Sequence, residues 1–200
     1  MKWILITIFS FSMYISNAQY PVLELGAEMP EADKMKCVVS NNEVYFDELA
    51  EENGILVIFS CNTCPFVVAW ENRYPIINEL ATDNNIGFAL VNSNFLKRND
   101  EDSPEAMKEH AKKHQYRWPY LIDKESMLAN KFGAQTTPHV FLFDKNMKLV
   151  YKGAIDDNYK DASKVEQFYL KDAINSLAKN EEIAVKETRN LGCSIKRKTD

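Results

Sequence analysis

The chain is poor in cysteine, glycine and histidine: its 200 residues include four Cys, six Gly and three His. Four cysteines are too few for a scaffold held by disulfides, so stability must come from a hydrophobic core. Internal repeats, low-complexity tracts and Gly/Ser linkers are absent, which favours a single domain. The formal net charge of −5 gives no general attraction for nucleic acid or anionic membranes, so neither is an expected partner.

The N-terminus has the pattern of a secretory signal peptide. Lys2 precedes an apolar stretch that ends at Ile15, and small residues follow up to Ala18. We expect residues 1–18 to be removed, leaving residues 19–200 as one domain. An uncleaved anchor is the alternative, but the apolar stretch is shorter than the ~20 residues that span a bilayer. The expected product is exported, to the bacterial periplasm or the extracellular medium, and has no membrane contact after cleavage.

Apolar patterning predicts alternating strands and helices after this segment. Strands are expected at 55–59, 86–91, 120–122, 140–143 and 149–151, and helices after residue 64, from 103 to 114, at 126–132 and at 163–179. A short hairpin is expected between 37 and 46. A βαβ unit followed by a ββα unit gives one mixed sheet with helices on both faces.

A Cys-x-x-Cys pair stands where the first buried strand ends and the next helix begins. Cys61 and Cys64 are separated by two residues, and Pro65 suits the first helical position because that position needs no N–H. Cys64 should therefore lie near the N-cap, beside the positive end of the helix dipole. Such a place lowers the pKa of a thiol, and the thiolate is the form that attacks disulfides. The motif predicts redox chemistry.

The chain resembles the redoxin superfamily of thioredoxin-like and peroxiredoxin-like proteins, in particular its exported members. The resemblance covers about residues 25–198 and is carried by the stretches Phe59–Val67, Val91–Asn94, Phe132–Pro138, Lys152–Asp157 and Gly192–Lys196. It implies a thioredoxin fold, with three α/β/α layers, a mixed central sheet and the hairpin as an N-terminal extension. It also implies a thiol-disulfide oxidoreductase in cell redox homeostasis that needs no cofactor. The expected partners are proteins that carry disulfides or dithiols, and an upstream redox partner.

The resemblance also assigns roles around Pro138, which matches the cis-proline that faces the cysteines in this fold. A cis bond would place the Thr137 backbone beside the sulfurs, ready to pair with an extended substrate. Pro65 and His139 are further substrate-contacting candidates. His139 either reaches the cleft and tunes the thiols or is a partly exposed histidine at a strand edge.

The sequence leaves open which cysteine is the nucleophile and what the other cysteines do. Matched on Cys-x-x-Cys order, Cys61 is the nucleophile; matched on strand spacing and the following proline, Cys64 is, and we favour Cys64. An inert bridge between them would close a very small loop and stabilise little. Cys37 and Cys193 are accessory thiols that are either bridged to each other or free, and Cys193 is also a candidate third thiol in the electron path.

Two other functions are weighed against this one. In peroxiredoxin-like antioxidant enzymes Thr or Ser stands three residues before the attacking cysteine. Here the residue three positions before Cys61 is Ile58, and the residue three positions before Cys64 is Cys61. Neither residue supplies the hydroxyl group, which argues against a peroxidase.

A metal role is the second alternative. Two cysteines and two histidines have the composition of a zinc-finger ligand set: Cys61, Cys64, His110 and His114. The gap between the cysteine pair and the histidine pair, however, far exceeds the ~12–15 residues of a zinc finger. The two histidines alternate with lysines and are interpreted as a solvated face. Copper-delivering members of the fold have a three-residue spacer between the cysteines and a distant histidine, here His139. We expect no metal.

Overall fold

The computed structural model describes residues 20–198, so the predicted signal peptide lies outside the described residues. The strands are β1 (Met35–Cys37), β2 (Glu43–Val44), β3 (Gly54–Ser60), β4 (Gly87–Asn92), β5 (Tyr120–Ile122), β6 (Thr136–Thr137), β7 (His139–Asp144), β8 (Leu149–Gly153) and β9 (Cys193–Ser194). The α-helices are α1 (Pro65–Trp70), α2 (Tyr74–Asp83), α3 (Pro104–Lys113), α4 (Met127–Phe132) and α5 (Tyr169–Ala178). Within residues 20–198 no helix has the length and apolar character needed to cross a membrane.

One mixed sheet organises the molecule, with strand order β2-β1-β5-β4-β3-β7-β8. Strands β3, β4 and β5 are parallel, whereas β7 runs antiparallel to β3 and forms a hairpin with β8. The N-terminal hairpin of β1 and β2 extends the sheet beyond β5. Separately, β9 pairs with β6. The predicted mixed sheet and N-terminal hairpin are confirmed.

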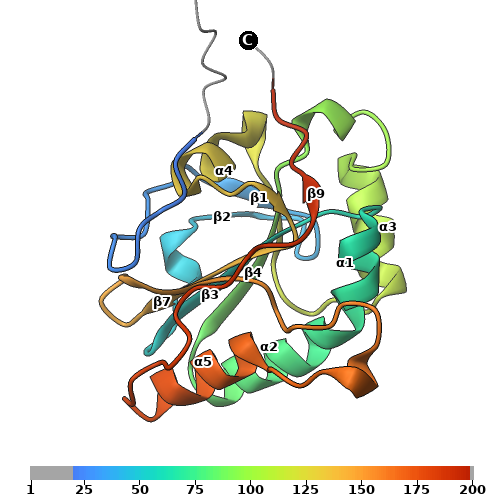
Figure 1. Ribbon diagram of the computed structural model, residues 1–200. Coiled ribbons are helices and arrows are strands. Elements are labelled where there is room, and N and C mark those ends of the chain that lie inside the picture. The colour runs from blue at the N-terminus through green and yellow to red at the C-terminus, as the bar shows by residue number, and fades with distance from the viewer. Residues whose placement is uncertain (1–19, 199–200) are drawn as a thin grey trace, which may run out of the picture.

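Helices cover both faces of the sheet, and alternate residues of β3 point to them. Leu56 and Ile58 pack on the face that carries α1, α2, α3 and α5, whereas Val57 and Phe59 pack on the face that carries α4. Figure 1 shows α2 and α5 side by side on one side of the sheet and α4 on the other. All seven residues of β3 are buried, as the unbroken apolar run predicts for a central strand.

The helix after the cysteines is interrupted, as a proline in its interior predicts. Helix α1 ends at Trp70, a 3₁₀ turn spans Glu71–Arg73, and Pro75 lies in the first turn of α2. Proline fits there because the first helical turn needs no N–H from it. The interruption places Glu71 on the inside of the bend, where its side chain is buried.

Two boundaries differ from the sequence-based expectation. The first strand of the N-terminal hairpin is Met35–Cys37 and so ends where the hairpin was expected to begin, because the chain turns through Asn41, which adopts a positive φ of 58°. The last helix begins at Tyr169, not at residue 163. The chain before it is held by the preceding turn instead: the Glu166 N–H donates to the Asp157 side chain.

Candidate active site

The Cys-x-x-Cys segment connects β3 to α1. Cys61 follows the last residue of β3, and Cys64 is the N-cap residue of α1, in an extended conformation with φ −63° and ψ 125°. Pro65 occupies the first turn of the helix and is exposed. The side chains of Cys61 and Cys64 are only 2% and 5% exposed, so both thiols lie just below the surface.

The loop before β7 faces these thiols, as the resemblance implies. The Thr137–Pro138 peptide bond is cis. The Thr137 hydroxyl lies 3.3 Å from the Cys61 Sγ, and the Cys64 thiol donates to the Thr137 carbonyl oxygen at 3.0 Å. Residues more than seventy positions apart in the sequence thus form one cluster.

The two thiols shift each other's pKa in opposite directions. A hydrogen bond from Cys61 lowers the pKa of Cys64, and hydrogen bonds from Cys193 and the Val67 N–H add to this effect. The same bond to Cys64 raises the pKa of Cys61, and burial and the nearby Asp102 carboxylate raise it further. When the reduced site loses a proton, the negative charge therefore resides on Cys64, where free N–H groups at the start of α1 stabilise it.

Cys193 is the third thiol of this cluster. Strand β9 pairs with β6 so that Cys193 lies opposite Thr137, whose carbonyl oxygen is 3.0 Å from the Cys64 Sγ, and Cys193 contributes to lowering the pKa of Cys64. All four cysteines are free thiols in the structure. Cys37 packs into the core on the other face of the sheet, so the structure does not form the Cys37–Cys193 bridge considered above.

His139 lies inside β7 rather than in the cleft. It is 2% exposed, its Nδ1 accepts from the Gln135 N–H at 3.2 Å, and its ring packs against Phe141. Burial, with a smaller contribution from Lys152, lowers the pKa of His139 to about 3, so the ring is neutral. The expectation of a partly exposed strand-edge histidine is therefore wrong, and within residues 20–198 His139 makes no hydrogen bond to the sulfurs.

A buried polar network that sequence reasoning missed fixes the loop between the cysteines. The Asn62 N–H donates to the Asp102 carboxylate at 3.0 Å, and the Tyr120 hydroxyl donates to the Asn62 side chain at 2.9 Å. Asp102 is fully buried and also accepts from the side chains of Asn92 and Asn94 at 2.8 and 2.9 Å. The only sequence signal was two asparagines directly after a buried strand.

His110 in α3 and His114 at its C-cap form a second polar cluster, and the interpretation of these histidines as a solvated face is wrong. His110 and His114 lie 2.5 and 3.1 Å from the two carboxylate oxygens of Glu71, and Tyr116 donates to the same carboxylate. A buried carboxylate needs such donors, which explains why these side chains turn inward. Glu71 and the two histidines present ligand atoms within 4.8 Å of one another, but Cys61 and Cys64 are not among them.

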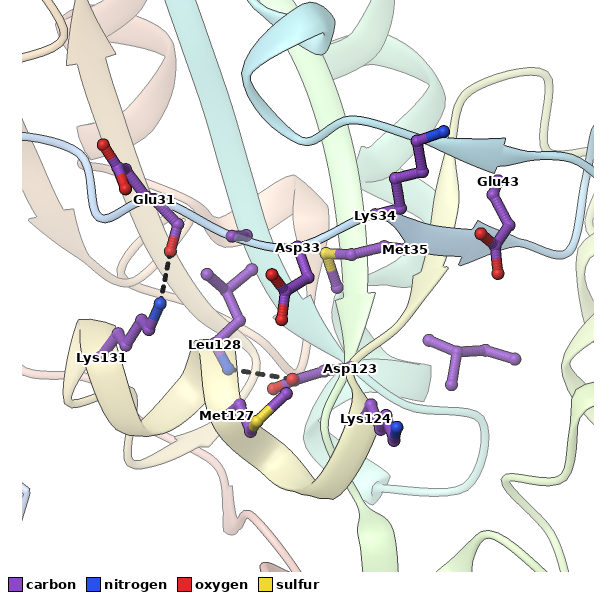
Figure 2. Close-up of a pocket in the computed structure, with 12 residues that line it drawn as sticks. Glu31, Asp33, Lys34, Met35, Glu43, Asp123, Lys124, Met127, Leu128 and Lys131 are labelled. Atoms are coloured by element: carbon purple, nitrogen blue, oxygen red, sulfur yellow. Dashed lines mark hydrogen bonds between the residues drawn. The ribbon is translucent and has the colours of Figure 1, made fainter.

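Two surface hollows were compared with the thiol cluster, one beside the Cys-x-x-Cys loop and one at β1 and α4. A groove of about 640 Å³ runs between the Cys-x-x-Cys loop and α3, and its lining includes Asn62, Thr63 and His114. Figure 2 shows a smaller pocket of about 270 Å³ at β1 and α4, lined by charges of both signs. Its Asp123 accepts from the Leu128 N–H at 2.9 Å and so caps α4. None of the four cysteines lines the smaller pocket, so it is separate from the thiol cluster.

Comparisons with known proteins agree with this architecture. The Redoxin family model matches residues 24–168. The thiol-disulfide oxidoreductase YkuV of Bacillus subtilis (strain 168) is 26% identical over 130 residues, which cover 64% of this chain and 83% of that protein. The crystal structure of an uncharacterized conserved protein from Geobacillus kaustophilus is similar with a TM-score of 0.82 and 29% identity, covering 92% and 95% of the two chains. The crystal structure of a hypothetical protein, SMc02350 from Sinorhizobium meliloti 1021, is similar with a TM-score of 0.80 and 25% identity, covering 90% of this chain and 98% of that one.

A mixed sheet covered by helices on both faces, with a thiol pair at the β3–α1 junction facing a cis-proline loop, defines a thioredoxin-like protein. The chain belongs to the Redoxin family, whose model matches well over half of it. The family and its named relative confirm the predicted fold and the predicted class, a thioredoxin-like oxidoreductase.

Proposed function

We propose that this protein is an exported thiol-disulfide oxidoreductase that acts through the Cys61–Cys64 dithiol/disulfide couple. The observation that carries the proposal is the place of Cys64, at the N-cap of α1 and in contact with both Cys61 and Thr137. A thiolate held at a helix N-terminus with a second thiol beside it is equipped to attack a disulfide and then to be released. The relative named as a thiol-disulfide oxidoreductase supports the same chemistry.

The reaction begins on Cys64. Its thiolate attacks one sulfur of a partner disulfide, a bond forms between Cys64 and that sulfur, and the other partner sulfur leaves as a thiolate that takes up a proton. Cys64 then carries no negative charge, so the largest of the interactions that raise the pKa of Cys61 disappears. Cys61 can lose its proton and attack the Cys64 sulfur, which expels the second partner thiol and leaves a Cys61–Cys64 disulfide.

An upstream dithiol returns the couple to its reduced form, and the same steps run in reverse oxidise a dithiol partner. Thr137 lies beside both sulfurs, and an extended partner would pair with its backbone in place of β9, which occupies that edge in the free protein. The exposed Pro65 borders the approach. Protein disulfides and dithiols are the proposed substrates. The N-terminal pattern supports export with removal of residues 1–18, which leaves residues 19–200 to act outside the cytoplasm.

The test is dithiothreitol-driven reduction of insulin disulfides by the purified chain that starts at residue 19. We expect turnover by the wild type and by Cys37→Ser, a matched control whose thiol lies on the other face of the sheet. Cys64→Ser should abolish turnover, because it removes the attacking group. Cys61→Ser, Cys193→Ser, which leaves no second thiol beside Cys64, should stall as a mixed disulfide on Cys64. Turnover by the wild type no faster than by the Cys61→Ser, Cys64→Ser double variant would refute the proposal.

A further inference from the structure

The last strand of the described chain lies against the thiol site. Strand β9 pairs antiparallel with β6, and the register sets Cys193 opposite Thr137. The Ile195 N–H continues this pairing by donating to the Gln135 carbonyl at 3.0 Å. In the view of Figure 1 this part of the chain, in red, crosses between α4 and the helices α1 and α3.

Specific contacts hold the segment around β9 in this place. The Asn190 side chain donates to the Thr136 hydroxyl at 3.0 Å, and the Lys196 N–H donates to the Asn94 side chain at 2.9 Å. Ile195 is only 7% exposed and belongs to the core that contains α4. The segment is therefore a fixed part of the fold and not a loose end.

Gly192 allows the close approach of this segment to the loop that faces the cysteines. A Cβ atom at position 192 would lie 2.4 Å from the Thr137 carbonyl oxygen, nearer than any real contact of that kind. This carbonyl is the one to which the Cys64 thiol donates. Only a residue without a side chain lets β9 pass so near to the reacting sulfur.

The position that β9 occupies is the one an extended partner would need. Strand β6 offers its edge N–H and C=O groups beside the sulfurs, and β9 already uses them. Cys64 is 5% exposed beneath this cover, whereas Cys193 is only partly buried. The chain thus presents one of its own thiols to Cys64 where a substrate sulfur would stand.

We propose that Cys193 is a third catalytic thiol, which exchanges with Cys64 to form a Cys64–Cys193 disulfide within the chain. The inference rests on the proposed role of Cys64 as the nucleophile. Cys61 and Cys193 flank Cys64, Cys61 on the inside and Cys193 toward the surface, so Cys64 has two partners within the chain. Cys37, on the other face of the sheet, has no part in the exchange.

The exchange conserves atoms and electrons. When Cys64 is joined to a partner sulfur, Cys193 loses its proton and attacks the Cys64 sulfur; the partner sulfur leaves as a thiolate and takes up a proton. The Cys64–Cys193 bond is thereby formed. Cys61 then loses its proton and attacks Cys64, which releases Cys193 as a thiolate that is reprotonated and leaves a Cys61–Cys64 disulfide. Burial raises the pKa of Cys193, which favours its return to the thiol form.

The experiment uses Cys61→Ser with Cys37 also replaced by Ser, so that only Cys64 and Cys193 remain. Oxidised glutathione, one equivalent per protein, is the oxidant, and non-reducing peptide mapping by mass spectrometry identifies the product. We expect a Cys64–Cys193 disulfide in the monomer with loss of two free thiols and release of two glutathione molecules. The control Cys61→Ser, Cys193→Ser should instead hold glutathione on Cys64.

Glutathione retained on Cys64 of the first variant while Cys193 stays a thiol, or a disulfide-linked dimer, would overturn the inference. Gly192→Ala gives a second readout that leaves every thiol in place: displacing β9 should lower the yield of the Cys64–Cys193 bond and raise the alkylation rate of Cys64 severalfold. An unchanged yield and rate would also count against it. Insulin reduction by the wild type, measured in parallel, distinguishes failure of this inference from failure of the proposed function.

Discussion

The Cys64 sulfur lies 3.0 Å from the carbonyl oxygen of Thr137. Thr137 also contacts Cys61 through its hydroxyl and pairs with Cys193 through its backbone. Thr137, the residue before the cis-proline, therefore contacts all three cysteines of the site. This arrangement explains why a cysteine near the C-terminus meets a motif in the first third of the chain.

The first prediction concerns the pH at which Cys64 reacts. A lowered pKa means that the thiolate persists at a pH where an ordinary thiol, with a pKa of about 8.5, is protonated. Alkylation of Cys64 by iodoacetamide, followed by mass spectrometry, should therefore be nearly constant between pH 7 and 9. In Cys61→Ala the rate should instead rise with pH in this range, because the hydrogen bond that lowers the pKa is lost. A wild-type rate that climbs like that of a free thiol would contradict this electrostatic account.

The second prediction concerns Asp102, which holds the loop between the cysteines. Asp102→Ala leaves three buried donors without their acceptor and should lower the free energy of unfolding by about 2–4 kcal/mol. Insulin reduction should fall as well, because the Asn62 backbone is no longer fixed. Urea unfolding measures the change in the free energy of unfolding.

Ser103→Ala is the matched control for Asp102→Ala. It removes a partly buried helix cap at the next position in the sequence and should lower the free energy of unfolding by only about 1 kcal/mol, with turnover retained. Equal effects of the two variants on turnover would show that the network does not position the loop.

The third prediction is a loss of stability in acid that depends on the cluster on α3. Burial lowers the pKa of His114 below 6.5, so its contribution is present above that pH and is lost as the pH falls through the folded pKa. Burial tends to raise the pKa of Glu71, but hydrogen bonds from His110 and Tyr116 outweigh it and keep the pKa below 4.5. Its contribution is lost at lower pH still. The melting temperature should therefore fall from pH 7 to 5, and less so in His114→Gln. Identical pH profiles of wild type and His114→Gln would be inconsistent with this assignment.

The fourth prediction concerns peroxide. No hydroxyl residue stands three positions before Cys61 or Cys64 to position a peroxide, so oxidation by hydrogen peroxide should be slow and should not saturate. Stopped-flow measurement of tryptophan fluorescence is suitable because Trp70 lies in α1, which Cys64 caps. A fast, saturable oxidation of Cys64 at micromolar peroxide would instead favour a peroxidase.

The sequence predicted the local features of the site well. The apolar run of β3, the cysteines after it and Pro65 lie close together in the chain, so strand periodicity and helix-start signals were enough to place Cys64 at an N-cap. The resemblance supplied the cis bond before Pro138, which no local pattern indicates.

The features that were missed depend on long-range contacts. Strand β9 has only two residues and no hydrophobic period, and its place depends on pairing with β6 more than fifty positions earlier. The histidines of α3 looked solvated because their partner, Glu71, is buried only through the bend between α1 and α2. A helix was expected from residue 163 because the apolar spacing ignores the turn at Asp157 that binds this segment.

Redox titration of the wild-type protein shows whether Cys61 and Cys64 form a reversible dithiol/disulfide couple. The protein is equilibrated in buffers of defined ratio of reduced to oxidised dithiothreitol, quenched with acid and alkylated, and its cysteines are mapped by mass spectrometry. We expect one reversible two-electron transition in which the Cys61–Cys64 disulfide opens and closes while Cys37 stays a thiol throughout. If Cys61 and Cys64 remain thiols under oxidising buffers, or form a bond that no accessible reductant opens, the account is contradicted.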